Sequence, residues 1–347
     1  MSVAARLEGL DAATRVVGGL GSVLLAAAIL SFLVAPALTG YLALAFAGFL
    51  VVSYLVEEEP TARFFLFVTT TSTVLVLGFI TVYLVANAVP VAREMGLYLL
   101  VGSDPFWSTG ENVYSLVPMM WGTVLTTVIA TLVAAPLGVA GAVFISEVAP
   151  GWAREVVKPA VEMLAGIPSI VYGFIGLTVL SPYFQTELAV PQLGNLFIVG
   201  FVIGVMALPT VVSVAEDAIA AVPGSMKDGA QALGATDWQT TTSVTLPAAF
   251  SGVSAAVLLG VGRAVGETMA ATVVLANVTD LPEPLANVFD STITLTSLIA
   301  SQYGAASGLQ FSGLFAAGVV LFLTVMALSV GSQLIERRMR RRLGGER

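Results

Sequence analysis

Long apolar stretches dominate this 347-residue sequence and constrain its fold more than any other feature. A helix needs about 20 consecutive apolar residues to cross the hydrocarbon core of a bilayer. Eight stretches reach this length, at approximately 16–34, 38–56, 64–90, 118–145, 157–180, 195–215, 247–276 and 311–335. Their apolar runs are continuous rather than alternating, which favours helices over the strands of a membrane barrel. We therefore expect an all-α, polytopic membrane protein, a helical bundle with about eight crossing helices.

The composition excludes most of the chemistry that a soluble enzyme uses. Charged residues make up only 10% of the chain, whereas soluble domains are about 25% charged. The sequence has no cysteine and no histidine, which removes disulfides, thiol nucleophiles, Cys/His zinc sites and histidine bases. It also lacks a Gly-x-x-x-x-Gly-Lys-Ser/Thr phosphate-binding loop. We therefore expect no catalytic residue, no metal and no cofactor, and we assign any ATP hydrolysis to a separate chain.

The distribution of lysine and arginine predicts the orientation of the helices. With the N-terminus placed inside, all but two of the 14 basic residues fall in cytoplasmic segments; Arg93 lies outside and Arg263 lies within a span. Basic residues concentrate on the cytoplasmic side of membrane proteins. The first apolar stretch is longer than a signal-peptide core and a second follows at once, so we expect it to be retained. Both termini are expected in the cytoplasm of a multi-pass cell-membrane protein.

Charge and hydropathy divide the chain into four segments. Residues 1–60 are expected to form an accessory hairpin of two spans, and residues 61–117 the first core helix with an exterior segment. Residues 118–336 hold the other core spans and a cytoplasmic loop at 216–247. Residues 337–347 form a basic cytoplasmic tail that favours anionic lipid. The long exterior loop that precedes the last span also has leucine and isoleucine at helical spacing, which predicts a short helix there.

The cytoplasmic loop contains two short helical patterns, at 225–233 and 237–245. Gly234 separates them, and glycine allows the positive φ that ends a helix and turns the chain. We expect Asp237 to be the N-cap of the second helix, with Trp238 exposed beside it. A helix–Gly–helix elbow of this kind offers a small, rigid docking surface for another protein, whereas the alternative interpretation is an ordinary polar loop.

Two charged residues, Arg263 and Glu267, interrupt the apolar stretch at 247–276. Residues four apart lie on one helix face, so we expect the two side chains within reach of an ion pair. An ionisable residue at mid-span costs about 2.5–3.5 kcal/mol on insertion scales and normally faces protein or a polar path. Two interpretations stay open: a pair that only fixes packing, and a path in which Arg263 meets an anion. Gly262 and Gly266 form a GxxxG step, which predicts close approach of another helix.

Pro168 follows Gly166 inside the apolar stretch at 157–180. Proline removes a backbone hydrogen bond, and the preceding glycine softens the helix, so we expect a break there. A broken helix at membrane depth is tolerated where it lines a cavity, and a restarted N-terminus attracts anions. Ser169 would supply a hydroxyl donor in such a path; the alternative is a kink for packing alone. Gly173 is expected to be a close-packing position.

Three motifs together resemble the PstC-type permease subunit of phosphate ABC importers, a binding-protein-dependent inner-membrane component. They are LAGIPSIVYG at 164–173, GATDWQTTTSVTLPAA at 234–249 and GRAVGETMA at 262–270. The second motif ends a loop that is similar to the EAA loop of ABC importer permeases. Asp228-Gly229-Ala230 replaces Glu-Ala-Ala there, followed by Gly234 and the closing Leu246-Pro247. The resemblance covers about residues 61–335 and implies a core of about six spans.

This resemblance implies a non-catalytic subunit that passes inorganic phosphate inward by alternating access. The partners it implies are an ATP-binding subunit dimer, a companion PstA-type permease subunit and an external phosphate-binding protein, within the lipid bilayer and without nucleic acid. We assign the substrate path to Pro168, Ser169, Arg263 and Glu267. We assign coupling to the ATPase to Asp228, Gly229, Ala230, Gly234, Asp237, Trp238, Leu246 and Pro247.

The sequence argues against four alternative functions. The motif at 262–270 argues against a permease for sulfate or molybdate, and Thr268-Met269-Ala270 favours PstC over the PstA-type companion. An ion-coupled secondary transporter often shows two related halves, and we see none here. A membrane-embedded enzyme would need a cluster of metal ligands, or a nucleophile with its base, which the sequence does not offer.

Overall fold

The computed structural model describes residues 12–342, which are mainly helical; the strands among them form one short hairpin, and irregular segments connect several of the helices. In this range seven helices are long and apolar enough to cross a membrane, and a bent helix pair makes an eighth candidate. The predicted all-α polytopic fold is therefore confirmed. The predictions for Arg6 and for tail residues 343–347 lie outside the described residues. Packing divides the chain into two compact units, Met1–Tyr83 and Leu84–Arg347.

The first unit contains α2 (Ala12–Val34), α3 (Pro36–Val56) and most of α4 (Glu58–Met95). Pro36 starts α3, where its missing N–H costs no hydrogen bond. The Ser53 and Thr61 hydroxyls share a buried hydrogen bond of 2.8 Å across the α3–α4 turn. Residue 60, where the sequence places the end of the accessory hairpin, lies in the first turn of α4.

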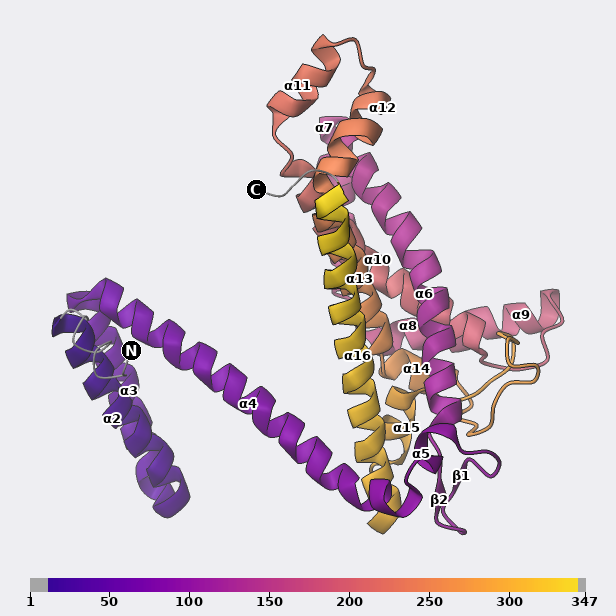
Figure 1. The fold of residues 1–347 in the computed structure, drawn as a ribbon, viewed down its shortest axis with the longest axis horizontal. Helices are drawn as coiled ribbons and strands as arrows, with labels where there is room; N and C mark the ends of the chain where they lie inside the picture. The colour runs from indigo at the N-terminus through magenta and orange to yellow at the C-terminus, as the bar shows by residue number, and fades with distance from the viewer. Residues whose placement is uncertain (1–11, 343–347) are drawn as a thin grey trace. The chain divides into compact units, whose positions relative to one another are not determined.

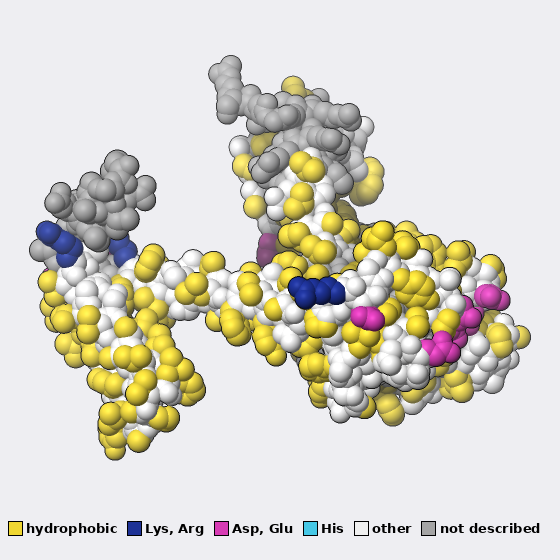
Figure 2. Space-filling view, turned by 60° about the horizontal axis from the view of Figure 1, so that its bottom comes forward, with side chains coloured by type: hydrophobic (Ala, Val, Ile, Leu, Met, Phe, Trp, Pro, Cys, Tyr) yellow, Lys and Arg dark blue, Asp and Glu magenta, His cyan; other side chains and the backbone are white. Residues whose placement is uncertain are grey.

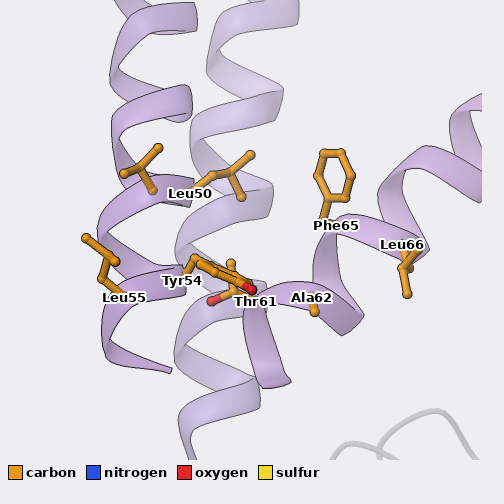
Figure 3. A pocket seen from close by; sticks show the side chains of 8 residues that line it. Leu50, Tyr54, Leu55, Thr61, Ala62, Phe65 and Leu66 are labelled. Atoms are coloured by element: carbon orange, nitrogen blue, oxygen red, sulfur yellow. The ribbon is translucent and has the colours of Figure 1, made fainter. Parts of the chain in front are cut away.

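An apolar pocket of about 480 Å³ opens beside this turn (Figure 3). Its lining comes from the end of α3 and the first turns of α4: Leu50, Val51, Tyr54, Leu55, Thr61, Ala62, Phe65 and Leu66. Nearly all of its surface is hydrocarbon, which suits contact with lipid chains or with another apolar helix.

The second unit is built on four long helices: α6 (Val117–Val143), α10 (Leu196–Ala220), α13 (Leu246–Val265) and α16 (Gly308–Arg342). Helix α10 is the most deeply buried candidate span and packs along both α6 and α13. Glycine makes the α6–α10 contact close: a Cβ at Gly200 would lie 2.6 Å from Ile129 Cβ. Small residues let helix backbones approach in the same way in membrane proteins generally.

One end of this bundle carries the short elements α5 (Tyr98–Val101), β1 (Trp107–Ser108), β2 (Val113–Tyr114) and α15 (Leu295–Gln302) (Figure 1). Helix α15 confirms the short helix predicted in the loop that precedes the last span. Strands β1 and β2 form an antiparallel pair in which Trp107 faces Tyr114. The indole Nε1–H of the half-buried Trp107 also donates to Gln302 Oε1 at 2.9 Å, which ties the hairpin to α15.

A serine hydroxyl fastens the last turns of α4 to α16. The Val91 N–H donates to Ser312 Oγ at 3.1 Å, and Ser312 Oγ donates to the Asn87 carbonyl at 2.7 Å. In a regular helix Val91 N–H would bond directly to the Asn87 carbonyl. The Ser312 hydroxyl contacts both backbone groups and so joins α4 to α16 at this point.

Apolar side chains cover much of the visible surface, and charged side chains occupy a few small patches (Figure 2). Large apolar residues are exposed on several long helices, including Leu132 on α6 and Leu259 on α13. Exposed apolar surface of this extent suits a lipid environment rather than water.

Candidate functional site

Arg263 lies in the last turn of α13 and is half-buried. Its Nη1 donates to Thr210 Oγ1 of α10 at 3.3 Å. The Arg263 side chain lines a cavity of about 720 Å³ between α13 and α16. Thr210 of α10 also lines this cavity. Among the described residues that line the cavity, Arg263 carries the one charge. The other polar lining residues are Thr210, Ser329 and Gln333.

Glu267 does not pair with Arg263, so the predicted ion pair is wrong. Helix α13 ends at Val265, and the chain restarts as α14 (Met269–Val274). The i, i+4 stacking of side chains requires a continuous helix, and the break at 266–268 removes it. Glu267 Oε1 instead accepts a 3.0 Å hydrogen bond from Ala270 N–H. A carboxylate is stabilised at a helix N-terminus, where the first amides lack partners.

No other helix of this chain makes the close approach predicted at Gly262 and Gly266 among the described residues. A Cβ built at Gly262 would meet nothing within 4 Å, and Gly262 borders the Arg263 cavity instead of another helix. Close approach occurs at Gly173, where a Cβ would lie 2.8 Å from Ala270 Cα of α14. This confirms the prediction for Gly173.

The predicted break at Pro168 is confirmed, and it divides the predicted span over 157–180 into two parts that form a bent helix pair. Helix α7 (Gly151–Ala165) ends before the break, and α8 (Ser169–Ile175) begins after it. The chain continues through the π-helical turn η2 (Gly176–Leu180) into α9 (Ser181–Glu187), and the two parts are bent by 91°. Proline breaks the helix because it lacks the N–H and clashes with the preceding turn.

A side-chain hydroxyl donates to a backbone carbonyl at each of the two breaks. The Tyr172 hydroxyl donates to the Leu164 carbonyl at 3.0 Å, and Thr296 Oγ1 donates to the Glu267 carbonyl at 2.7 Å. Open backbone groups need such partners where water is scarce. Because α8 packs on α14, the two interrupted helices meet. Of the four predicted path residues, Arg263 is among the described residues that line this cavity, whereas Pro168, Ser169 and Glu267 lie at the two helix breaks.

The loop at 216–247 folds as the predicted elbow. Helix α11 (Gly224–Ala232) is followed by Gly234 at φ +91°, then by α12 (Asp237–Thr240) and the π-helical turn η3 (Thr241–Thr245). A positive φ of this size is the reason for glycine at the turn. Figure 1 shows α11 and α12 at the opposite end of the bundle from α15 and the hairpin.

The N-cap of α12 is Thr236, which corrects the prediction of Asp237. Thr236 Oγ1 accepts from Gln239 N–H at 3.3 Å, and Gln239 Oε1 accepts from Thr236 N–H at 2.9 Å. This reciprocal capping box satisfies two open amides, which a lone aspartate cap does not. Asp237 Oδ1 accepts from Gln231 Nε2 at 2.9 Å and so holds α12 against α11.

The elbow presents apolar side chains at its surface. Leu233 is 92% exposed and Trp238 is 65% exposed, as predicted for Trp238. Asp228 and Gly229 are also exposed, whereas Ala230, Leu246 and Pro247 are half-buried. Leu246 and Pro247 form the first turn of α13, and Leu246 packs against the buried core at the base of the loop. The predicted coupling residues therefore divide into an exposed tip and a packed base.

Sequence reasoning missed the charged residues at the base of the elbow. Lys227 Nζ donates to Glu147 Oε1 at 2.6 Å, and Lys158 pairs with Glu216 and Asp217. Glu147 lies in the π-helical turn η1 (Phe144–Val148), which follows α6. No local spacing signals these contacts, because the partners are far apart in the sequence.

Comparison with known proteins identifies a protein family that this chain matches. The sequence profile of the family described as binding-protein-dependent transport system inner membrane component matches residues 134–341. The phosphate transport system permease protein PstC of Pasteurella multocida is 37% identical over 251 residues, which cover 67% of this chain and 78% of that protein. The probable ABC transporter permease protein YqgH of Bacillus subtilis is 45% identical over 192 residues, which cover 55% of this chain and 61% of that protein.

Two solved structures share the fold. The inward-facing MetNI methionine ABC transporter matches with a TM-score of 0.52 at 21% identity, over 65% of this chain and 95% of that chain. A bacterial ABC transporter involved in alginate import matches with a TM-score of 0.54 at 15% identity, over 82% of this chain and 98% of that chain.

Proposed function

Because the chain belongs to the binding-protein-dependent transport system inner membrane component family, we propose that it is the permease subunit of an importer for inorganic phosphate. The observation that carries this proposal is the half-buried Arg263 in a cavity of about 720 Å³. A guanidinium is permanently charged, and its planar fork of donors matches tetrahedral oxyanions. Thr210, Ser329 and Gln333 add neutral hydrogen-bonding groups to the cavity. The PstC relatives are phosphate permeases, which indicates phosphate as the anion.

The partners follow from the two ends of the bundle. We place the elbow in the cytoplasm, where its exposed Leu233 and Trp238 dock an ATP-binding subunit dimer that hydrolyses ATP for the complex. The C-terminal end of α16 lies at the same end of the bundle as the elbow (Figure 1), which supports a cytoplasmic C-terminus. A companion PstA-type permease subunit completes the membrane part, and an external phosphate-binding protein delivers the substrate to the opposite end. Transport then proceeds by alternating access.

The proposal predicts which anion stimulates ATP hydrolysis. The complex is purified with its ATPase and external binding protein, reconstituted in vesicles, and assayed with phosphate, sulfate and molybdate. We expect phosphate to stimulate hydrolysis and to accumulate in the vesicles, because the chain's relatives and its Arg263 cavity both suit that anion. If sulfate or molybdate stimulates ATP hydrolysis as much as phosphate does, or more, the proposal that phosphate is the substrate is wrong.

The N-terminal hairpin is expected to be dispensable for transport. Deletion of residues 2–56 removes α2 and α3, an even number of spans, so the remaining helices keep their orientation. The Arg263 cavity, both helix breaks and the elbow all lie in the unit Leu84–Arg347. We expect phosphate uptake in reconstituted vesicles to stay within a few-fold of that of the full chain. Loss of uptake by a variant that inserts and assembles normally would show that the hairpin takes part in transport.

A further inference from the structure

Helix α11 has one side-chain ion pair to the membrane helices among the described residues. Lys227 Nζ donates to Glu147 Oε1 at 2.6 Å, with side chains that are 24% and 11% exposed. None of the residues of α11 is itself buried. The pair is more shielded from water than an exposed ion pair, so salt screens it less. The position of α11 against the bundle therefore depends on this contact more than on apolar packing.

Glu147 belongs to η1, which is not adjacent to the elbow in the sequence. The elbow continues directly into α13 and follows α10 after a short turn, whereas η1 ends α6, about 80 residues earlier. Arg154 of α7 holds η1 from another side, donating to the Ile145 and Ser146 carbonyls at 2.7 and 2.5 Å. These carbonyls belong to the end of a helix, where internal donors run out.

A second charged contact continues from α7 into the core. Lys158, one turn after Arg154 on α7, pairs with Glu216 of α10, whose side chain is 7% exposed, and with Asp217 at 3.4 Å. Charged contacts thus connect α11 to η1, η1 to α7 and α7 to α10. Removal of one partner from a buried ion pair strongly destabilises the folded protein, because the remaining charge is left without compensation. Separation of these charged groups is therefore costly.

We infer that the Lys227–Glu147 pair is the link through which movement of the elbow reaches α6. This inference rests on the proposed function, because it takes the elbow as the ATPase-docking element. The backbone alone would transmit elbow movement to α10 and α13. The ion pair adds a direct contact between α11 and the end of α6, besides the packing of α6 along α10 and α13. Lys227 and Glu147 are positioning residues in this mechanism and do not touch the substrate.

The test compares ATP hydrolysis with phosphate uptake in the reconstituted complex. Glu147→Gln and Lys227→Gln are expected to keep the ATPase subunit bound and hydrolysing, while phosphate taken up per ATP falls at least about tenfold. The charge swap Glu147→Lys with Lys227→Glu is expected to restore the ratio. If a single variant fails to insert, the double variant Glu147→Gln with Lys227→Gln replaces it, because it leaves no unpaired buried charge.

The exposed pair Arg63–Glu59 provides the matched control. Its side chains are 66% and 75% exposed, and Arg63→Gln is expected to leave the uptake-to-hydrolysis ratio unchanged. Single variants with the unaltered ratio would overturn the inference, as would loss of the bound ATPase subunit or a charge swap that restores nothing. Failure of the unmutated complex to import phosphate would count against the proposed function instead.

Discussion

Replacement of Arg263 by glutamine is expected to abolish phosphate uptake while the complex still assembles. Glutamine keeps a polar side chain that can donate to Thr210 Oγ1, so the contact between α13 and α10 survives. The charge that would meet the anion is lost. A hydrogen bond to a charged group contributes about 1.5–3 kcal/mol, equivalent to about a 10- to 150-fold loss of affinity for the anion. The measurement is uptake of labelled phosphate by vesicles that contain the complex and ATP.

Variants of Glu267 separate the anion path from helix packing. Glu267→Gln keeps an oxygen that can accept from Ala270 N–H, so we expect it to assemble normally. Glu267→Ala loses this contact at the start of α14, at a cost of about 0.5–2 kcal/mol of stability by analogy with lost helix caps. The swap Arg263→Glu with Glu267→Arg is expected to restore no uptake, because the two residues are not partners. Full uptake by an assembled Arg263→Gln complex would remove Arg263 from the path.

The membrane helices and their breaks differ in how far the sequence predicts them. Crossing helices are encoded by long apolar stretches, which hydropathy detects without any knowledge of packing. The break at Pro168 was also predictable, because proline acts on the backbone itself. The break after Val265 has no such residue, and Gly266 alone also fits a continuous helix. Assuming a continuous helix there produced the incorrect Arg263–Glu267 pair.

In the elbow, too, local features were predictable from the sequence and contacts between distant elements were not. Gly234 marks the turn locally, because its positive φ favours glycine. The cap at Thr236 was also readable, since Gln239 stands three residues later as the second half of a capping box. The Lys227–Glu147 contact was not predictable, because a single sequence carries no signal for pairing across distant elements. The cavity beside Arg263 depends likewise on how α10, α13 and α16 pack.

Changes at the tip of the elbow are expected to release the ATPase subunit. Trp238 is 65% exposed, so Trp238→Asp removes a large apolar contact surface without disturbing the core. Truncation of an interface tryptophan that acts as a hot spot costs about 2 kcal/mol or more, equivalent to at least about 30-fold weaker binding. The measurement is recovery of the ATPase subunit in a pull-down from membranes that contain equal amounts of this chain.

Gly234→Pro tests the same surface through the backbone. Proline fixes φ near −65°, whereas Gly234 has a φ of +91°, so the angle between α11 and α12 must change. A Cβ at this position would meet nothing within 4 Å, so the effect comes from the turn and not from crowding. We expect the same loss of ATPase recovery as for Trp238→Asp, with the chain still inserted in the membrane.

Trp152 offers a matched control for the docking surface. It is 72% exposed and lies in the first turn of α7, outside the elbow, so Trp152→Asp makes the same chemical change at a different site. If docking belongs to the elbow, Trp152→Asp keeps the ATPase subunit and Trp238→Asp releases it. Undiminished recovery with both elbow variants would remove the docking role. Equal losses for the two tryptophan variants would assign docking to a wider surface that includes α7.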